Sequence, residues 1–122
     1  MTRIETISSD ILRGHTDTVV LGTLLDGDRY GYEIYNTIME LTSGEFKLKE
    51  TTLYSSYKRL EREGCISSYW GDETLGARRK YYRINDKGRA LFEQNRRDWE
   101  FTRRILDTLI MTDSTEGEKN GQ

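Results

Sequence analysis

The sequence predicts a mainly α-helical protein that contains one small β-hairpin, and three observations support this class. Apolar residues recur at helical spacing through most of the first 64 residues. The spacing then changes to strict alternation in two short segments, 65–71 and 79–84. Helical spacing returns after residue 85 and continues to about residue 111.

The first predicted helix covers residues 8–27. Ser8 and Asp10 are suitable capping residues at its start, and Gly27 is expected to end it. Its apolar residues recur at roughly helical spacing: Ile11, Leu12, Val19, Val20 and Leu24. His15 lies within this helix, where we expect a role in packing or at an interface.

Two shorter helices follow, over residues 30–44 and 51–64. The first has one apolar stripe, formed by Ile34, Ile38 and Leu41, and Gly44 is placed to be its C′ residue. The second begins at Thr51 as a cap, ends at Gly64, and has an inward stripe formed by Leu53, Tyr57 and Leu60. The intervening segment 45–49, EFKLK, could add one short strand.

The alternating segments predict the two strands of a hairpin. Ile66, Ser68 and Trp70 share one face of the first strand, and we assign Trp70 to packing against the core. In the second strand Tyr82 is assigned to the core, and Tyr81 to the surface or to a phosphate contact. Residues 72–77 have the composition of a turn.

A last helix is expected from Asn85 or Asp86 to about Met111, and the polar tail after it is expected to be disordered. Three helices followed by a hairpin is the element order of a winged helix-turn-helix domain. We therefore expect such a domain over residues 8–85, a C-terminal dimerisation helix over 86–111, and a tail over 112–122.

The composition excludes several classes of protein. Its longest apolar runs are too short to span a bilayer, and the N-terminus lacks a secretory pattern, so we expect a cytoplasmic protein that does not enter membranes. Cys65 and His15 are the single residues of their types, which excludes a disulfide within the chain and a Cys/His zinc site. We expect no metal, no cofactor and no enzymatic activity.

The net charge of −2 hides an uneven distribution. Residues 45–90 carry 11 basic and 7 acidic side chains, whereas the segments on both sides are net negative. Salt confines the reach of each charge to about 8–10 Å, so a local excess can attract a polyanion that the average charge would repel. In a winged helix these basic residues would lie on the third helix and on the wing, which contact DNA.

Three stretches of the sequence together resemble the PadR family of bacterial transcription regulators. They are VVLGTLLDGDRYGYEI, TTLYSSYKRLEREGCI and RRKYYRINDKGRALF, and the resemblance covers about residues 11–92. The short fourth helix is similar to the small-sized branch of the family. This resemblance implies a homodimeric winged helix that represses nearby genes until a small hydrophobic or phenolic effector relieves the repression.

The chain departs from the pattern of that family at a few positions. The family commonly has proline where Asp28 and Ser55 stand, and Pro-Gly where Glu50 and Thr51 stand. Because proline in a first turn mainly pre-sets φ, its absence does not threaten the fold. Glu50 is expected to alter base preference or to weaken affinity.

The third helix and the hairpin provide the candidate DNA contacts. Thr51, at the helix start, and the residues projecting away from its inward stripe are suited to reading bases and phosphates: Thr52, Tyr54, Ser55 and Lys58. Arg59 and Arg62 are weaker candidates because Glu50, Glu61 and Glu63 lie close enough to pair with them. On the hairpin the candidates are Arg78, Arg79 and Lys80. The alternatives are an ordinary solvated helix face and a basic strand edge that protects against aggregation.

The last helix has an apolar stripe that predicts contact with another chain, formed by Phe92, Trp99, Leu106 and Leu109. An aromatic cavity at a two-fold axis would suit a planar apolar ligand, and in the resembled family a tryptophan on this helix lines the effector site. Asn95 could supply a polar contact there, or it could fix the register of the dimer. For Trp99 the alternative is plain packing.

Two functions from different classes follow from these expectations. The first is a sequence-specific regulator that binds double-stranded DNA at an inverted-repeat operator as a homodimer, relieved by a small aromatic or phenolic effector. The second is a winged-helix module that binds other proteins without specific DNA binding. Strong salt dependence of DNA binding distinguishes the first from the second.

Overall fold

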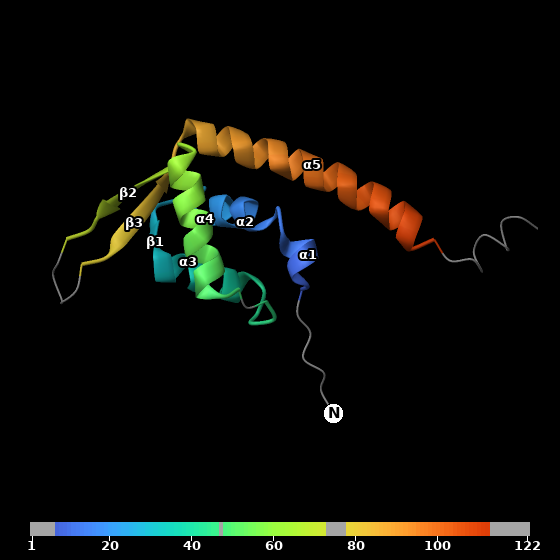
Figure 1. The fold of residues 1–122 in the computed structure, drawn as a ribbon, viewed down its shortest axis with the longest axis horizontal. Helices are drawn as coiled ribbons and strands as arrows, with labels where there is room; N and C mark the ends of the chain where they lie inside the picture. Colours follow the sequence, from blue (N-terminus) through green and yellow to red (C-terminus); the bar gives the residue numbers. More distant parts are fainter. Residues whose placement is uncertain (1–6, 47, 73–77, 113–122) are drawn as a thin grey trace, which may run out of the picture. The chain divides into compact units, whose positions relative to one another are not determined.

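The structure of the chain is a computed structural model that describes residues 7–46, 48–72 and 78–112. Its elements are α1 (Ser9–Leu12), α2 (Thr16–Thr23), β1 (Arg29–Tyr30), α3 (Gly31–Leu41), α4 (Glu50–Arg62), β2 (Ile66–Trp70), β3 (Lys80–Ile84) and α5 (Asp86–Ile110) (Figure 1). The expected mainly helical class with a small sheet is confirmed. The chain divides into two compact units between Phe92 and Glu93, so the first seven residues of α5 belong to the first unit.

The first predicted helix, 8–27, is two helices. Gly14 interrupts it with a φ of 91°, a left-handed conformation that favours glycine, and α2 then ends at Thr23 rather than at Gly27. The expected cap at Ser8 is confirmed, since the Ile11 N–H donates a hydrogen bond to the Ser8 Oγ over 3.3 Å. Helical spacing continues across the break, which is why the apolar pattern did not reveal it.

Helix α3 ends one residue earlier than expected. Ser43, not Gly44, is the C′ residue with a positive φ of 53°, and the Gly44 N–H donates to the Met39 carbonyl over 2.8 Å, as in a Schellman motif. Ile34 and Ile38 are buried as predicted, but Leu41 is 76% exposed. Leu41 lies in the last turn of α3, and Leu48 from the following loop joins the core instead.

Helix α4 has the inward stripe that the sequence predicts, because Leu53, Tyr57 and Leu60 are all buried. Its N-cap residue is Lys49, so the prediction of Thr51 as the cap is wrong by two residues. Its C-terminal end matches the prediction: Gly64 has a φ of 77°, and the Cys65 N–H donates to the Leu60 carbonyl over 2.9 Å.

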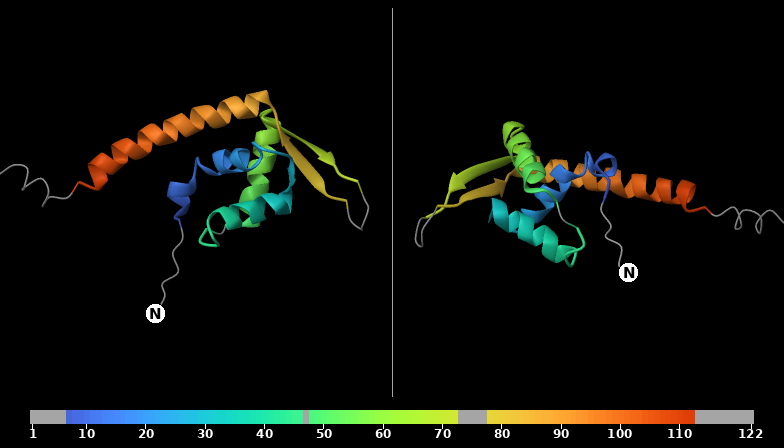
Figure 2. Two further views of the ribbon diagram at one scale, coloured as in Figure 1. Left: turned by 180° about the vertical axis from the view of Figure 1, so that it is seen from behind. Right: turned by 60° about the horizontal axis from the view of Figure 1, so that its bottom comes forward.

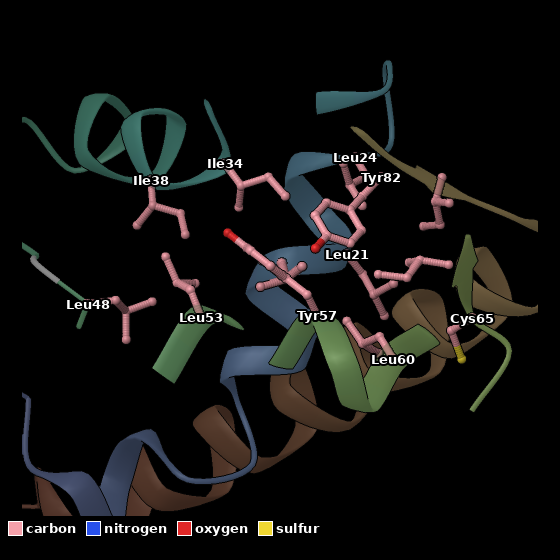
Figure 3. Packing of buried hydrophobic residues seen from close by; sticks show 13 residues of the cluster. Leu21, Leu24, Ile34, Ile38, Leu48, Leu53, Tyr57, Leu60, Cys65 and Tyr82 are labelled. Atoms are coloured by element: carbon pink, nitrogen blue, oxygen red, sulfur yellow. The ribbon is translucent and has the colours of Figure 1, made fainter. Parts of the chain in front are cut away.

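The core of the first unit lies between α2, α3, α4 and the sheet (Figure 3). Its buried hydrophobic members are Val20, Leu21, Leu24, Ile34, Ile38, Leu48, Leu53, Tyr57, Leu60, Cys65, Ile66, Tyr82 and Ile84. At its centre the Tyr57 Oη donates to the Gly31 carbonyl over 2.9 Å, so the hydroxyl of this buried ring is satisfied. Burial raises the pKa of Tyr57, and it raises that of Tyr82 to about 12, so both phenols stay neutral.

The sheet has three antiparallel strands in the order β1-β3-β2. The predicted hairpin is confirmed, with Ile66 opposite Ile84 and Trp70 opposite Lys80. The sequence predictions missed β1, and they were wrong to suggest a strand in 45–49, where none of the described residues is in a strand. Two residues are too short for an alternating pattern to be recognised.

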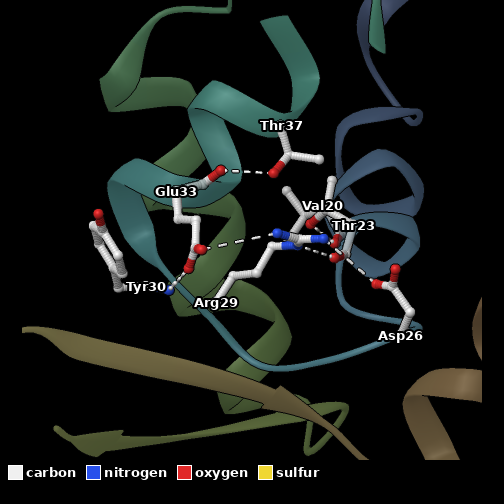
Figure 4. Close-up of polar contacts among 7 residues, drawn as sticks. All are labelled: Val20, Thr23, Asp26, Arg29, Tyr30, Glu33 and Thr37. Atoms are coloured by element: carbon white, nitrogen blue, oxygen red, sulfur yellow. Dashed lines mark hydrogen bonds and ion pairs between the residues drawn. The ribbon is translucent and has the colours of Figure 1, made fainter. Parts of the chain in front are cut away.

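Polar contacts of Arg29 and Glu33 hold β1 between α2 and α3 (Figure 4). The Arg29 Nε donates to the Thr23 carbonyl over 2.7 Å, and its Nη1 lies 3.9 Å from the Glu33 carboxylate. The Tyr30 N–H donates to the Glu33 Oε1 over 3.3 Å, so this backbone donor at the start of α3 has an acceptor. Because a strand of two residues forms few ladder hydrogen bonds, these side-chain contacts hold it in place.

The first seven residues of α5 pack within the first unit. The Gly88 N–H donates to the Asn85 Oδ1 over 2.8 Å, which confirms Asn85 as the cap, and Leu91 and Phe92 pack against the core. The second unit, within its described residues 93–112, contains the rest of this helix, up to Ile110, and two further residues. Its large apolar residues are exposed: Trp99, Phe101, Ile105, Leu106, Leu109, Ile110 and Met111. Among the described residues, no helix is long and apolar enough to cross a membrane.

Candidate nucleic-acid interface

The outer face of α4 consists of Thr51, Tyr54, Ser55 and Lys58, whose side chains are exposed. The face lies beside the inward stripe, because Tyr54 and Lys58 each follow a buried residue of the stripe by one position, a rotation of about 100° around the helix. It presents hydroxyl groups and one ammonium, which donate to phosphate oxygens and to base edges. Thr52, also a predicted contact, is half-buried and lies off this face.

Tyr54 is held at the edge of the outer face by its neighbours. Its ring packs edge to face on Tyr57, with centroids 5.0 Å apart, and it lies against Gly31 at the start of α3. A Cβ at Gly31 would come within 2.8 Å of the Tyr54 Oη. Glycine at position 31 therefore leaves room for the tyrosine that the α4 surface presents.

Arg59 does not belong to the outer face of α4. Its Nη2 pairs with the Asp17 carboxylate of α2 over 2.6 Å, and the Ser56 Oγ donates to the same carboxylate over 2.6 Å. Glu61, which we expected to pair along α4, accepts a hydrogen bond from the Ser68 Oγ of β2 instead. Burial of Asp17 by itself raises its pKa, but the hydrogen bonds from Arg59 and Ser56 outweigh burial and hold the pKa below its usual value.

The basic arm is the distal part of the hairpin, residues 69–72 and 78–81. Its three consecutive cations are exposed, and each lies over an aromatic ring: Arg78 over Trp70 at 5.4 Å, Arg79 over Tyr30 at 4.7 Å, and Lys80 over Tyr82 at 5.8 Å. Within the part of the chain that the structure describes, no carboxylate pairs with any of the three. The cations are held by rings that leave their charge uncompensated.

Within the first unit the arm extends away from α2 and α3, as the two further views in Figure 2 also show. The expected assignment of Trp70 to core packing is wrong, because the ring is 56% exposed and is covered on one side by Arg78. Alternation correctly places Trp70 on the same face as Ile66, but the core ends before the strand does. The predicted turn residues 73–77 lie outside the described residues.

The other side of the sheet, which we call the outer sheet face, carries Tyr30, Tyr69, Tyr81, Arg79 and Arg83. Tyr81 stacks on Tyr69, with centroids 5.6 Å apart, and meets Tyr30 edge to face at 5.5 Å. Tyr81 was expected at the surface, and it lies there half-buried between the rings of Tyr69 and Tyr30. No sequence pattern predicted this layer, because its third ring comes from the short strand β1.

Asp28 joins the outer sheet face to the loop before β1. Its Oδ2 accepts hydrogen bonds from the Tyr69 Oη over 2.5 Å and from the Arg83 Nε over 3.1 Å, and the Arg83 Nη2 lies 3.0 Å away. The hydrogen bond from Tyr69, with that from Arg83, lowers the pKa of Asp28. Arg83 is therefore neutralised, unlike the three cations of the arm.

The predicted dimer and effector residues lie on α5. Phe92 belongs to the first unit, where its ring would lie 3.1 Å from a Cβ at Gly22, so part of its surface is already covered within the chain. Trp99, Leu106 and Leu109 remain 43–69% exposed, and Asn95 is half-buried. Across residues 7–46, 48–72 and 78–112, no group of three or more His, Cys, Asp or Glu side chains gathers to hold a metal ion.

Comparison with known proteins finds the same family by sequence and by fold. The sequence model of the transcriptional regulator PadR-like family matches residues 20–94. A transcriptional regulator from Clostridium thermocellum is 45% identical, with a TM-score of 0.79 over 86% of this chain and 99% of that one. A PadR family transcription regulator from Clostridium difficile is 33% identical, with a TM-score of 0.68 over 80% and 99% of the two chains. Bacillus subtilis PadR, solved in complex with operator DNA, shares the fold at 24% identity, with a TM-score of 0.58 over 64% of this chain and 45% of that one.

Proposed function

Because the chain belongs to the PadR-like family of transcriptional regulators, we propose that it controls transcription by binding a specific double-stranded DNA operator. This family consists of transcription regulators and not of enzymes. As a regulator of this kind, the protein is proposed to act in the cytoplasm, where it would have access to DNA.

The observation that carries the proposal is the combination of the outer face of α4 with the basic arm. Helix α4 presents hydroxyls and Lys58 on a face that is exposed, and β2 of the arm packs against α4. The arm presents Arg78, Arg79 and Lys80 without carboxylate partners among the described residues. A helix that reads the major groove beside a hairpin that neutralises phosphates is how winged helices bind DNA.

The family supports this proposal. A PadR protein of the same fold has been solved with its operator DNA, so that fold can bind an operator. In the present chain the acidic side chains that would oppose DNA binding are partly neutralised, as Asp17 pairs with Arg59 and Asp28 with Arg83. The arm itself contains three cations and one carboxylate, Asp72, so it is positive within a chain that has a net charge of −2.

The proposal includes a homodimer formed through α5. Trp99, Leu106 and Leu109 are exposed on one side of a helix, and a two-fold axis would bury the same residues of both protomers. With two recognition helices about 34 Å apart, the operator is an inverted repeat whose half-sites lie about 10 bp apart. We propose repression as its mode of action.

We also propose that a small aromatic or phenolic effector binds next to Trp99 and Asn95 and relieves repression. The ligand would act by favouring a dimer geometry that fits DNA less well, which typically lowers affinity by about 5–150-fold. Flat aromatic compounds should quench Trp99 fluorescence and weaken operator binding, with Trp70 and Trp99 separated by single Trp→Phe variants. Quenching of Trp99 without any loss of operator affinity would leave the tryptophan as plain packing.

Selection of bound DNA from a random pool tests the main proposal. Recovered duplexes should share an inverted repeat, and their affinity should fall steeply as salt rises, because each neutralised phosphate releases counterions. A pool that yields no common sequence, together with DNA binding that salt does not affect, would favour the alternative, a module that binds other proteins.

A further inference from the structure

The outer sheet face contains a continuous series of contacts that ends at the arm. It begins at Asp28, which accepts hydrogen bonds from Tyr69 at 2.5 Å and from Arg83 at 3.1 Å. The Arg83 guanidinium also lies 5.0 Å from the centre of the Tyr69 ring, so both partners of Asp28 touch each other. Three groups from the loop before β1, from β2 and from β3 are thereby fixed together. We call these three residues the Asp28 clasp.

The clasp continues through aromatic rings. Tyr69 stacks on Tyr81 with an angle of 13° between the ring planes, and Tyr81 meets Tyr30 edge to face. Tyr81 also fills the space above Gly71, where a Cβ would lie 2.5 Å from its ring. Arg79 lies 4.7 Å above the ring of Tyr30. Each contact therefore depends on the position of the preceding one, from Asp28 to Arg79.

Only one of the three arm cations is connected in this way. Arg78 lies over Trp70 and Lys80 over Tyr82, which belong to the opposite side of the sheet. Beyond β1 the arm has only two strands, and a two-stranded hairpin is at best marginally stable in water. The ladder holds the backbone of Arg79, since the Gly71 N–H donates to the Arg79 carbonyl over 2.8 Å, whereas the outer sheet face holds its side chain over Tyr30.

We propose that Asp28 is a positioning residue for DNA binding, which holds the arm through Tyr69 and Arg83 so that Arg79 meets the phosphate backbone. The inference rests on the proposed function. Asp28 itself lies away from DNA in this assignment, because a carboxylate would repel the phosphates and its charge is used by Arg83. Its side chain is only 27% exposed.

The test compares Asp28→Asn with Asp26→Asn, which removes the same charge two residues earlier in the loop. Asp26 is 81% exposed, and within the described part of the chain its carboxylate pairs with Arg29 at 3.5 Å and with no member of the clasp. Binding of both variants to an operator duplex recovered by selection is measured as a function of salt. Asp28→Asn should lose about five- to tenfold in affinity at ~0.1 M salt and lower the salt slope by about one, the effect of one lost phosphate contact. Asp26→Asn should bind as the wild type does, or slightly more tightly.

Double variants identify the contact that is lost. If Asp28 acts through Arg79, then Asp28→Asn combined with Arg79→Ala should bind no more weakly than Arg79→Ala alone. Asp28→Asn combined with Lys80→Ala should show the full loss of both single variants. Tyr69→Phe, which keeps the ring stack and removes one hydrogen bond, should give a smaller loss than Asp28→Asn. Equal or tighter operator binding by Asp28→Asn would overturn the proposal, and would show that Asp28 merely masks Arg83.

Hydrogen exchange without DNA separates this inference from the proposed function. In Asp28→Asn the amides of residues 69–71 and 79–82 should exchange faster, while those of α4 keep their wild-type rates. Unchanged exchange in the arm would overturn the positioning role even if DNA binding fell. If the wild type binds no duplex, the proposed function fails, and faster exchange would still establish that Asp28 holds the arm.

Discussion

Gly88 shows how a single missing side chain allows α5 to join the first unit. The residue is buried at the start of the helix, and a Cβ there would lie 2.2 Å from the Cys65 carbonyl oxygen and 2.8 Å from Ile84. One of these neighbours is backbone, which cannot rotate away. Close contact between α5 and the start of β2 therefore requires glycine.

Replacing Gly88 with Ala should destabilise the protein, although alanine is the better helix former by about 1 kcal/mol. The clash should cost about 1–3 kcal/mol or more, as overpacking of a core does. Urea denaturation would measure the change. Gly27→Ala is the matched control, because apart from its two chain neighbours no described residue has an atom within 4 Å of its Cβ position, and it should leave the midpoint nearly unchanged. A Gly88→Ala variant as stable as the wild type would contradict the close approach.

Asp17 links α2 to α4 and gives the fold a defined pH dependence. Its pKa is lowered in the folded state, since the hydrogen bonds from Arg59 and Ser56 outweigh the effect of burial. A lowered carboxylate pKa stabilises the fold fully above the unfolded value of about 3.9, and this stabilisation is lost as the pH falls through the lowered pKa.

Asp17→Asn should therefore lower the free energy of unfolding at pH 7 by about 1–2 kcal/mol, a moderate value because Arg59 remains 40% exposed. The variant should also lose less stability than the wild type when the pH is lowered from 5 to about 2. Urea denaturation at several pH values measures both effects. Asp10→Asn breaks a fully surface-exposed pair with Arg13 and should change stability very little.

At the scale of elements, α4 and the basic arm divide the proposed work of DNA binding. The outer face of α4 is rigid, because three buried residues and the Asp17–Arg59 pair hold the helix in place. The arm extends away from the core, and its cations are held by aromatic rings (Figure 2). A rigid helix suits base readout, and a cationic arm suits phosphate contact.

Substitutions on the two elements should consequently have different signatures. Arg79→Ala should weaken binding to all duplexes to a similar extent and reduce the salt slope by about one. Lys58→Ala should weaken the selected operator more than random DNA if Lys58 reaches a base, by about 1–3 kcal/mol. Titrations of operator and random duplexes at several salt concentrations measure both. Arg89→Ala, an exposed cation on α5, is the charge control, and unchanged affinity in the first two variants would argue against the interface.

At the scale of the whole molecule, the described part of the second unit has no core of its own. Its helix exposes Trp99, Leu106 and Leu109, and an isolated helix gains most of its stability from packing an apolar face. If the protein is the homodimer that we propose, the same apolar face of a second copy packs against this helix.

Sedimentation equilibrium should find a dimer at micromolar concentration, and Trp99→Ala should shift it toward monomer. The loss of a large buried aromatic typically costs about 3–5 kcal/mol, and a symmetric interface contains it twice. Phe101→Ala is the matched control, since this 58% exposed aromatic lies two residues away and thus on another side of the helix. A wild type that sediments as a monomer would contradict the proposed dimer and its operator spacing.

The order of the helices and of the hairpin could be predicted from the sequence, because buried stripes repeat with the period of the element that carries them. The spacing of Leu53, Tyr57 and Leu60 predicts the inward side of α4, and Gly64 predicts where the helix ends. Most candidate residues of α4 follow directly, as those outside the stripe, but the half-buried position of Thr52 does not. The basic run 78–80 is visible as a local excess of charge, which needs no tertiary information.

Only the tertiary structure decided which residues lie next to one another across the chain. Asp28, Tyr69 and Arg83 are separated by up to 55 residues, and no periodicity connects a loop, β2 and β3. The same holds for Asp17 with Arg59, which local charge spacing assigned to partners on its own helix. The exposure of Trp70 depends on how far the core extends along β2. Alternation shows which side of a strand faces the core, but it does not show how much of the strand the core covers. Periodicity records which side of an element is buried, whereas contacts between elements depend on how the chain packs.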